Sequence, residues 1–158
     1  MKLDKIDLAI LSVLQRDGRI TKLGLAEAVH LSPAACWERL RRLETAGVIR
    51  GYGARIDMER IARRVTVLVE ITLKSHRQTD FQLFEAAVAR EPSIVSCHAT
   101  GGGIDYMLKV IAPDIDAYQK TIDRLLTSEV GIDRYFTYVV TKIVKDGPEP
   151  ADLAEASV

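Results

Sequence analysis

The segment from residue 31 to residue 56 constrains the fold of this chain more than any other stretch. Ser32 followed by Pro33 predicts the start of a helix, because a serine side chain caps the first turn and proline suits the first helical position. Gly47 predicts the end of the same helix. A helix with a defined start and a defined end is therefore expected here, directly after a turn at His30–Ser32.

The two faces of this predicted helix differ. At about 100° per residue, Cys36, Leu40 and Leu43 form one apolar stripe, which predicts the buried side. The outer face begins with small side chains, which allow close approach to a surface, and continues with arginines that can reach phosphates or guanine edges. The candidate DNA-contacting residues of the cap, outer face and flanks are Ser32, Ala34, Ala35, Glu38, Arg39, Arg41 and Arg42.

Two further helices are expected before this one, over residues 4–16 and after a Thr21 cap. After Gly47, residues 48–56 predict a small hairpin, or wing, that adds Arg50 and Arg55 to the candidate DNA contacts. Two helices with a short turn, a basic outer face and a wing are typical of a winged helix-turn-helix. The alternative for the arginines is a solvated face with no partner.

The distribution of charge agrees with a DNA-binding front part, although the net charge is zero. Residues 1–64 contain 13 Lys and Arg against 8 Asp and Glu, a balance of +5, and residues 65–158 contain 9 against 14, a balance of −5. This asymmetry indicates an anionic partner for one part only, unless the two parts pair with each other.

The remaining composition indicates a cytoplasmic location. The start of the chain is charged and periodic, which argues against a secretory signal, and no apolar run is long enough to suggest a membrane segment. Cys36 and Cys97 stand apart, which fits a reducing compartment and excludes a cysteine zinc site. We expect no metal, no cofactor and no membrane partner.

Residues 65–145 predict a second domain. Strands are expected over residues 65–73, 94–99, 105–112 and 134–144, with helices over residues 80–90 and after an Asp114 cap. The order βαββαβ predicts a ferredoxin-like α+β domain with both helices on one face of the sheet. Leu68 and the near-continuous apolar run 136–144 make the other face partly apolar, so we expect it to be covered by self-association.

Three motifs in this order resemble one family. "LDKIDLAILSVLQRDGRI", "LSPAACWERLRRLETAGVIRGY" and "DYMLKV…DIDAYQKTIDRLLTSEVGI…TYVV" are similar to the leucine-responsive and asparagine-responsive regulators, the Lrp/AsnC family. The likeness extends from about Leu3 to Lys145. It implies a transcription regulator with a helix-turn-helix domain (residues 1–60, hinge about 52–64) and an effector and dimerisation domain (65–145). Residues 146–158 are expected to form a flexible acidic tail.

The resemblance further implies double-stranded DNA with an inverted repeat as a partner, assembly into dimers and then tetramers or octamers, and an amino-acid effector. It places effector contacts on Asp105, Ile115, Tyr138, Val139 and Val140. From the local chemistry, glycine N–H groups suit a carboxylate and Asp105 suits an ammonium group. A plain hairpin turn is the alternative. The candidate effector residues next to the glycine turn are Thr100, Gly101, Gly102, Gly103 and Asp105.

The chain departs from the family pattern at three places. His30 stands where the family often has glycine, and Ala34-Ala35 stands for the usual Thr-Pro. Gly103 stands where the family has an acidic residue, so one charge is missing near the expected effector. We assign no catalytic residue, because no nucleophile, metal or nucleotide motif is present. The alternative function is an amino-acid-binding enzyme or allosteric subunit with a helical docking arm, and a regulator without an effector is also considered.

Overall fold

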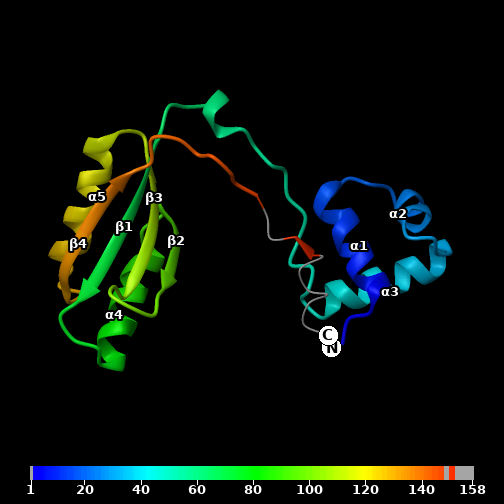
Figure 1. Cartoon of the computed structure of the whole chain (residues 1–158), viewed down its shortest axis with the longest axis horizontal. Coiled ribbons are helices and arrows are strands. Elements are labelled where there is room, and N and C mark those ends of the chain that lie inside the picture. Colours follow the sequence, from blue (N-terminus) through cyan, green and yellow to red (C-terminus); the bar gives the residue numbers. More distant parts are fainter. Residues whose placement is uncertain (1, 148–149, 152–158) are drawn as a thin grey trace. The chain divides into compact units, whose positions relative to one another are not determined.

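The computed structural model describes residues 2–147, 150 and 151. The chain forms two compact units (Figure 1). Residues 1–56 and 145–158 belong to the first, and residues 57–144 form the second. The first contains three helices, and the second contains a four-stranded sheet with two helices. The α+β class and the order of the elements are as predicted. The expected tail lies mostly outside the described residues; the N–H of Ala151 within it donates to Gln15 Oε1 at 2.8 Å.

The first unit is built from α1 (Lys5–Arg16), α2 (Lys22–Ala28) and α3 (Pro33–Thr45). A side-chain oxygen accepts a backbone N–H at the start of each helix, where these donors have no helical partner. The capping residues are Asp4, Thr21 and Ser32. Thr21 and Ser32 confirm the predicted starts, and Pro33 occupies the first turn of α3 as expected.

The apolar stripe of α3 is the core of this unit. Cys36, Leu40 and Leu43 are 2%, 6% and 0% exposed and pack with Ile10 of α1 and Leu25 of α2. Burial raises the pKa of the Cys36 thiol, so little of it is thiolate at neutral pH. Cys36 is therefore a packing residue, and the outer face of α3 is fixed by the burial of its inner face.

The turn between α2 and α3 depends on an unusual backbone conformation. His30 has φ of 55°, in the left-handed region, and its side chain is exposed. The N–H of Leu31 donates to the carbonyl of Ala26 at 2.9 Å, which closes the end of α2. This conformation is sterically unfavourable for a residue with a Cβ, whereas glycine adopts it with little strain. The turn is short because the chain reverses at a single residue.

The expected hairpin over residues 48–56 is not formed, and this part of the prediction was wrong. The N–H groups of Val48 and Ile49 both donate to the carbonyl of Leu43, at 3.0 and 3.2 Å, and close the end of α3. Residues 50–57 contain no strand. Gly51 and Gly53 lack side chains for cross-strand packing, so this segment has little to hold a strand pair together.

The second unit begins with a short 3-10 turn, Met58–Arg60, which is followed by β1 (Val65–Leu73). The other elements are α4 (Gln78–Arg90), β2 (Ile94–Ala99), β3 (Tyr106–Ala112), α5 (Ile115–Thr127) and β4 (Ile132–Val139). The strand order is β2-β3-β1-β4 and all neighbours are antiparallel. This is the ferredoxin-like arrangement that the order βαββαβ predicts.

The core of this unit lies between the sheet and its two helices. Alternate residues of the central strand β1, from Val67 to Leu73, are at most 3% exposed. Phe84 of α4 and Ile122 of α5 are equally buried against them. The N-cap Asp114 accepts from the N–H of Ala117 at 2.7 Å, as predicted for the start of α5. The two helices thus cover the centre of one face of the sheet.

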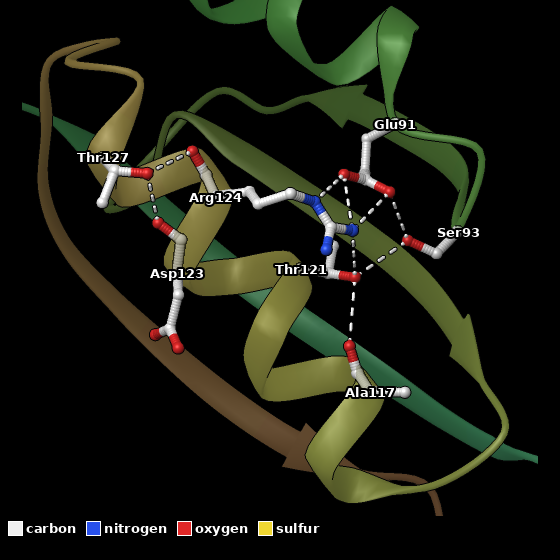
Figure 2. Close-up of polar contacts among 7 residues, drawn as sticks. All are labelled: Glu91, Ser93, Ala117, Thr121, Asp123, Arg124 and Thr127. Atoms are coloured by element: carbon white, nitrogen blue, oxygen red, sulfur yellow. Dashed lines mark hydrogen bonds and ion pairs between the residues drawn. The ribbon is translucent and has the colours of Figure 1, made fainter.

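A polar cluster ties α5 to the turn between α4 and β2 (Figure 2). Arg124 donates to both carboxylate oxygens of Glu91, at 2.9 and 3.0 Å, in a two-point arrangement. The Ser93 hydroxyl bonds to Glu91 and lies 3.1 Å from the oxygen of the buried Thr121. These bonds satisfy the buried hydroxyl and hold α5 in place along the sheet.

The opposite face of the sheet carries no helix in the described part of the unit. Its side chains alternate with the buried ones and include apolar residues: Leu68, Met107, Ile111, Phe136 and Tyr138. Phe136 and Tyr138 are about half exposed, at 53% and 48%. The two-faced character expected from the sequence is therefore present, although Glu70 and Lys109 lie among these residues.

Most predicted bounds agree with the structure within two residues, and the last strand does not. It was expected over residues 134–144, and β4 covers Ile132–Val139. Beyond it, the N–H of Val140 still donates to the carbonyl of Thr66 at 2.9 Å. Strand pairing ends there because the partner strand β1 begins at Val65, so residues 141–144, which include the apolar Ile143 and Val144, have no strand to pair with.

We predict that replacing His30 changes stability according to backbone conformation alone. His30→Gly should stabilise the first unit, and His30→Val should destabilise it by about 1–2 kcal/mol relative to His30→Gly, because a β-branched residue strongly resists positive φ. Urea denaturation, monitored through Trp37 fluorescence, measures the free energy of unfolding of both variants. Equal stability of the two variants would contradict the assignment of a strained turn.

Candidate DNA-contact surface and effector site

The outer face of α3 begins at its cap. Ser32 Oγ accepts from the N–H of Ala35 at 3.3 Å, which satisfies one free donor of the first turn. Ser32 and Ala34 are exposed and Ala35 is half-buried. No long side chain extends from these positions, so a partner could approach the backbone of this turn closely. Glu38, one turn further, is exposed on the same face and lines two shallow hollows there.

Two of the predicted arginines are paired with acidic residues of α1. Arg39 donates to Asp4 at 2.6 Å and to Asp7 at 2.9 Å, and Arg42 donates to Asp7 at 2.6 Å. The Asp7 side chain is fully buried, whereas the side chains of Arg39 and Arg42 are 26% and 48% exposed. These three ion pairs join α1 to α3.

The charge state of this cluster is reinforced by its geometry. Backbone hydrogen bonding from Asp7, and next the Arg39 guanidinium, hold the pKa of Asp4 below its usual value. Asp4 and then Asp7 raise the pKa of Arg39. Both partners shift in the direction that keeps them charged. Two arginines and two aspartates therefore cancel one another, and the cluster adds no net charge to the surface.

Sequence reasoning missed the two acids. The helix starting at residue 4 was predicted, but Asp4 and Asp7 were not considered as partners of the arginines. The spacing Asp-x-x-Asp at a helix start is a recognisable signal, because the two side chains cap each other's backbone N–H, at 2.8 and 3.1 Å. That the same carboxylates also hold Arg39 and Arg42 depends on tertiary packing.

The other predicted arginines carry no such partner. The side chains of Arg41, Arg50 and Arg55 are exposed and make no hydrogen bond or ion pair within residues 2–147, 150 and 151. Arg41 lies on α3, and the other two lie on the segment that follows it. Among the arginines predicted to contact DNA, these three therefore have all their guanidinium N–H donors available.

The beginning of that segment is held against the end of α3. The Tyr52 hydroxyl donates to Glu44 Oε1 at 2.8 Å. Burial, and then the neighbouring carboxylate, raise the pKa of Tyr52 to about 12, so the hydroxyl keeps the proton it donates at neutral pH. Arg50 is therefore attached near α3 by this bond and by the partly buried Ile49, even without a hairpin.

The glycine turn of the second unit joins β2 to β3. Gly101, Gly102 and Gly103 are exposed, and a Cβ added at any of them would meet nothing within 4 Å. Gly102 has φ of 138°, which disfavours other residues. Thr100 closes the turn, since its hydroxyl donates to the carbonyl of Ile104 at 2.7 Å. Space is available above the glycine backbone.

Asp105 lies directly beside this turn and is already engaged. Its Oδ2 accepts from the backbone N–H of Leu73 at 2.7 Å, and His76 Nε2 lies 3.0 Å from Oδ1 and 3.2 Å from Oδ2. His76 is exposed and stacks on Phe81, with ring centroids 5.9 Å apart. Sequence reasoning missed His76, which follows β1 by three residues and carried no recognisable motif. Asp105 therefore accepts a backbone hydrogen bond at the end of β1, in addition to any contact with a ligand.

Within one chain, the predicted effector residues form two separate groups. Asp105 lies at the end of β1, beside Leu73, whereas Val140 pairs with Thr66 near its beginning. Thr66 and Leu73 are separated by roughly 20 Å along the strand. Ile115 follows β3, whose last residue pairs with Val65, so it belongs with Val140.

The remaining two residues join the group of Val140. Tyr138 and Val139 pair with Leu68 and Val67. Tyr138 lies on the helix-free face and donates to Glu70 Oε2 at 3.2 Å. A single subunit thus does not bring the two groups together into one pocket.

The two units define a class of protein, a helix-turn-helix protein with a ferredoxin-like second domain. The known proteins to which the chain is similar belong to the same class. Residues 3–50 match a winged helix-turn-helix DNA-binding family, and residues 66–150 match the Lrp/AsnC ligand-binding domain. The chain is 57% identical over 145 residues to the transcriptional regulatory protein DoeX of Halomonas elongata, covering 92% of each. It is 42% identical over 143 residues to the leucine-responsive regulatory protein of Escherichia coli, covering 90% of this chain and 87% of the relative.

Solved structures agree with these relatives. An AsnC family transcriptional regulator from Agrobacterium tumefaciens matches with a TM-score of 0.87 at 32% identity, over 96% of this chain and 99% of that one. A transcriptional regulator of Neisseria meningitidis in complex with L-methionine matches with a TM-score of 0.83 at 33% identity, over 92% and 94%. The chain belongs to the Lrp/AsnC family: it is a transcriptional regulator with a helix-turn-helix DNA-binding domain and a ligand-binding domain.

Two further observations limit the chemistry of the described residues. Among them, no group of three or more His, Cys, Asp and Glu is arranged to hold a metal ion. No helix in the same part of the chain is long and apolar enough to cross a membrane.

Proposed function

We propose that the regulator contacts DNA through the outer face of α3 and through the segment that follows it. The observation that carries this proposal is the pairing of the arginines: Arg39 and Arg42 are held by Asp4 and Asp7, whereas Arg41, Arg50 and Arg55 keep all their donors. Unpaired guanidinium groups suit phosphate and guanine edges. Ser32, Ala34 and Ala35 permit close approach at the start of α3, and Glu38 lies where a base donor could reach it.

A dimer would then present six unpaired arginines to one duplex. With a slope of about −0.9 per phosphate contact, we predict that log K for DNA falls with log salt with a slope near −5. Arg41→Ala should make this slope less steep by about two units in a dimer, and it should weaken binding to all sequences. Fluorescence anisotropy with a labelled duplex at several salt concentrations measures both quantities.

Arg90→Ala is the matched control, because Arg90 is an exposed arginine of α4 in the second unit. It should leave the salt slope unchanged. A wild-type slope near zero, or an Arg41→Ala slope equal to that of wild type, would refute the proposed contact surface.

We propose that the regulator self-associates through the helix-free face of its sheet. The half-exposed Phe136 and Tyr138, together with Leu68, Met107 and Ile111, form an apolar area that two helices on the other face leave uncovered. A second copy covers this area and is itself covered in return. The symmetric pair supports an operator with an inverted repeat, whose half-sites are about one helical turn or a multiple of it apart. Tetramers or octamers would follow from further contacts between dimers.

The assembly is tested by one charge on this face. Phe136→Glu should lower the mass measured by light scattering, because it places a carboxylate against an apolar partner surface. The wild type should have at least twice the mass of one chain. Leu83→Glu is the control, because Leu83 is equally exposed but lies on α4. A monomeric wild type, or a Phe136→Glu protein of wild-type mass, would exclude this interface.

We propose an amino acid or a close relative as the effector, bound between subunits. One relative is named as leucine-responsive and one neighbour is described in complex with L-methionine. Two groups of candidate residues lie at opposite ends of the sheet, which supports a site assembled from two chains. The glycine turn offers N–H donors to a carboxylate, and Asp105 offers an acceptor to an ammonium group.

His76 competes for this acceptor, since its Nε2 lies 3.0 Å from Asp105 Oδ1. An ammonium group at Asp105 would have to share the carboxylate with His76 or displace it. Oδ2 also accepts from the Leu73 N–H, so a ligand that displaces His76 would bind chiefly at Oδ1. The effector is therefore expected to bind more tightly when His76 is removed.

A thermal-shift screen of the amino acids tests this site. At least one should raise the melting temperature, since a ligand at 100 times its Kd stabilises by about 2.7 kcal/mol. Asp105→Asn should remove the shift and His76→Ala should enlarge it, whereas the exposed control Asp133→Asn should behave as wild type. A shift in Asp105→Asn equal to that of wild type would place the effector elsewhere.

The proposed role is regulatory and not catalytic, and it is exercised in the cytoplasm, where DNA is accessible and Cys36 and Cys97 remain reduced. The alternative is an amino-acid-binding enzyme with a docking arm. Such a protein does not require unpaired arginines near the start of a helix whose first side chains are short. Binding of the protein to a heparin column, with elution only at raised salt, favours the regulator over this alternative.

A further inference from the structure

Burial of the Asp7 carboxylate is energetically unfavourable in a small helical unit, because a charged group loses its hydration. Its Oδ1 accepts from Arg39, and its Oδ2 accepts from Arg42 and from the backbone N–H of Asp4 at 3.1 Å. Stability alone does not require this arrangement, because apolar residues of similar volume often replace a buried ion pair at no cost or with a gain. The cluster instead fixes the orientation of two long side chains on α3.

The two arginines are fixed in different ways. Arg39 donates twice through one terminal nitrogen, to Asp4 and to Asp7, and its side chain is only 26% exposed. Arg42 donates through Nη2 alone, and its side chain is 48% exposed. A guanidinium group has five N–H donors in a planar fork, so Arg42 keeps the donors of its remaining nitrogens for an outside partner.

The position of Arg42 on the surface agrees with this division. Arg42 lines both shallow hollows on the outer face of α3: one with Ala35, Glu38 and Arg39, the other with Glu38, Arg41, Thr45 and Ala46. It therefore lies between the small side chains of the first turn and the unpaired Arg41. An arginine held at this place needs little further ordering when it meets a base edge.

We propose that Asp7 is a positioning residue for DNA readout: it holds Arg39 as a strut between α1 and α3 and aims the free edge of Arg42 at the DNA. This inference rests on the proposed contact surface and assigns different tasks within it. Arg41, Arg50 and Arg55 supply affinity to any duplex. Arg42, oriented by a carboxylate that itself never touches DNA, supplies discrimination between sequences.

The role requires arginine at position 42, because one side chain must reach Asp7 and the DNA at once. Lysine keeps the charge but is a compact cation without a planar fork. Arg42→Lys therefore separates charge from geometry. At Arg41, where no internal partner is held, the same replacement alters one contact without disturbing the cluster.

The test compares two duplexes of equal length: one selected from a random pool by the wild-type protein, and one of random sequence. Asp7→Asn should lower affinity for the selected duplex by about tenfold or more. Its affinity for the random duplex should stay the same or rise, because two arginines lose their buried counter-charge. Asp17→Asn, an equal charge change at the end of α1, should keep the wild-type ratio of the two affinities.

A destabilised Asp7→Asn protein would not leave the question open, because the lysine pair decides it independently. Arg42→Lys should lower the ratio of the two affinities by about tenfold, and Arg41→Lys should shift both affinities together. If Asp7→Asn folds and loses affinity equally for both duplexes, or keeps the wild-type ratio, its role is only structural and the proposal is overturned. An unchanged ratio in Arg42→Lys overturns it as well.

The outcome also separates this inference from the proposed contact surface. If Arg41→Ala, Arg42→Ala and Arg50→Ala all bind both duplexes as wild type does, α3 is not the contact surface and both proposals fail. If these variants lose affinity while Asp7→Asn and Arg42→Lys keep the wild-type ratio, the contact surface stands and only the positioning role of Asp7 is refuted.

Discussion

Two helices can cover only one face of a four-stranded sheet, and the organisation of this regulator depends on that constraint. β1 is central, and its inner side chains are almost completely buried beneath α4 and α5. The other face keeps Phe136 and Tyr138 half exposed, which is why we propose a second copy as its cover. If the two sheets pair with their strands antiparallel, the Asp105 end of one sheet would lie near the Val140 end of the other, and the two DNA-binding units would be related by symmetry.

In the DNA-binding unit, the arrangement of charge is more informative than its sum. Residues 1–64 have an excess of five positive charges, but two arginines of α3 are neutralised by Asp4 and Asp7. A count of basic residues on a helical wheel treats all arginines alike. The structure divides them into paired and unpaired groups, and we assign affinity to the unpaired ones and sequence discrimination to Arg42.

Local patterns predicted most of the fold, and long-range packing explains what they missed. The burial of Cys36, Leu40 and Leu43 and the alternation in β1 follow from periodicity alone. The hairpin failed because Gly51 and Gly53 favour a turn without providing side chains to hold a strand pair. The Asp7 pairs join residues 32 and 35 positions apart, and the separation of Asp105 from Val140 follows from strand register. Neither can be read from local sequence.

The central claim is that unpaired arginines of the first unit meet the DNA, and arginine-specific modification by phenylglyoxal tests it directly in the full-length protein. Mass spectrometry of the modified peptides reports each arginine with and without a bound duplex. Without DNA, Arg41 should react faster than the ion-paired Arg39. With DNA, Arg41, Arg50 and Arg55 should become protected while Arg77 and Arg90 of the second unit keep their reactivity. Protection of Arg77 and Arg90, with Arg41 as reactive as in the free protein, would contradict the claim.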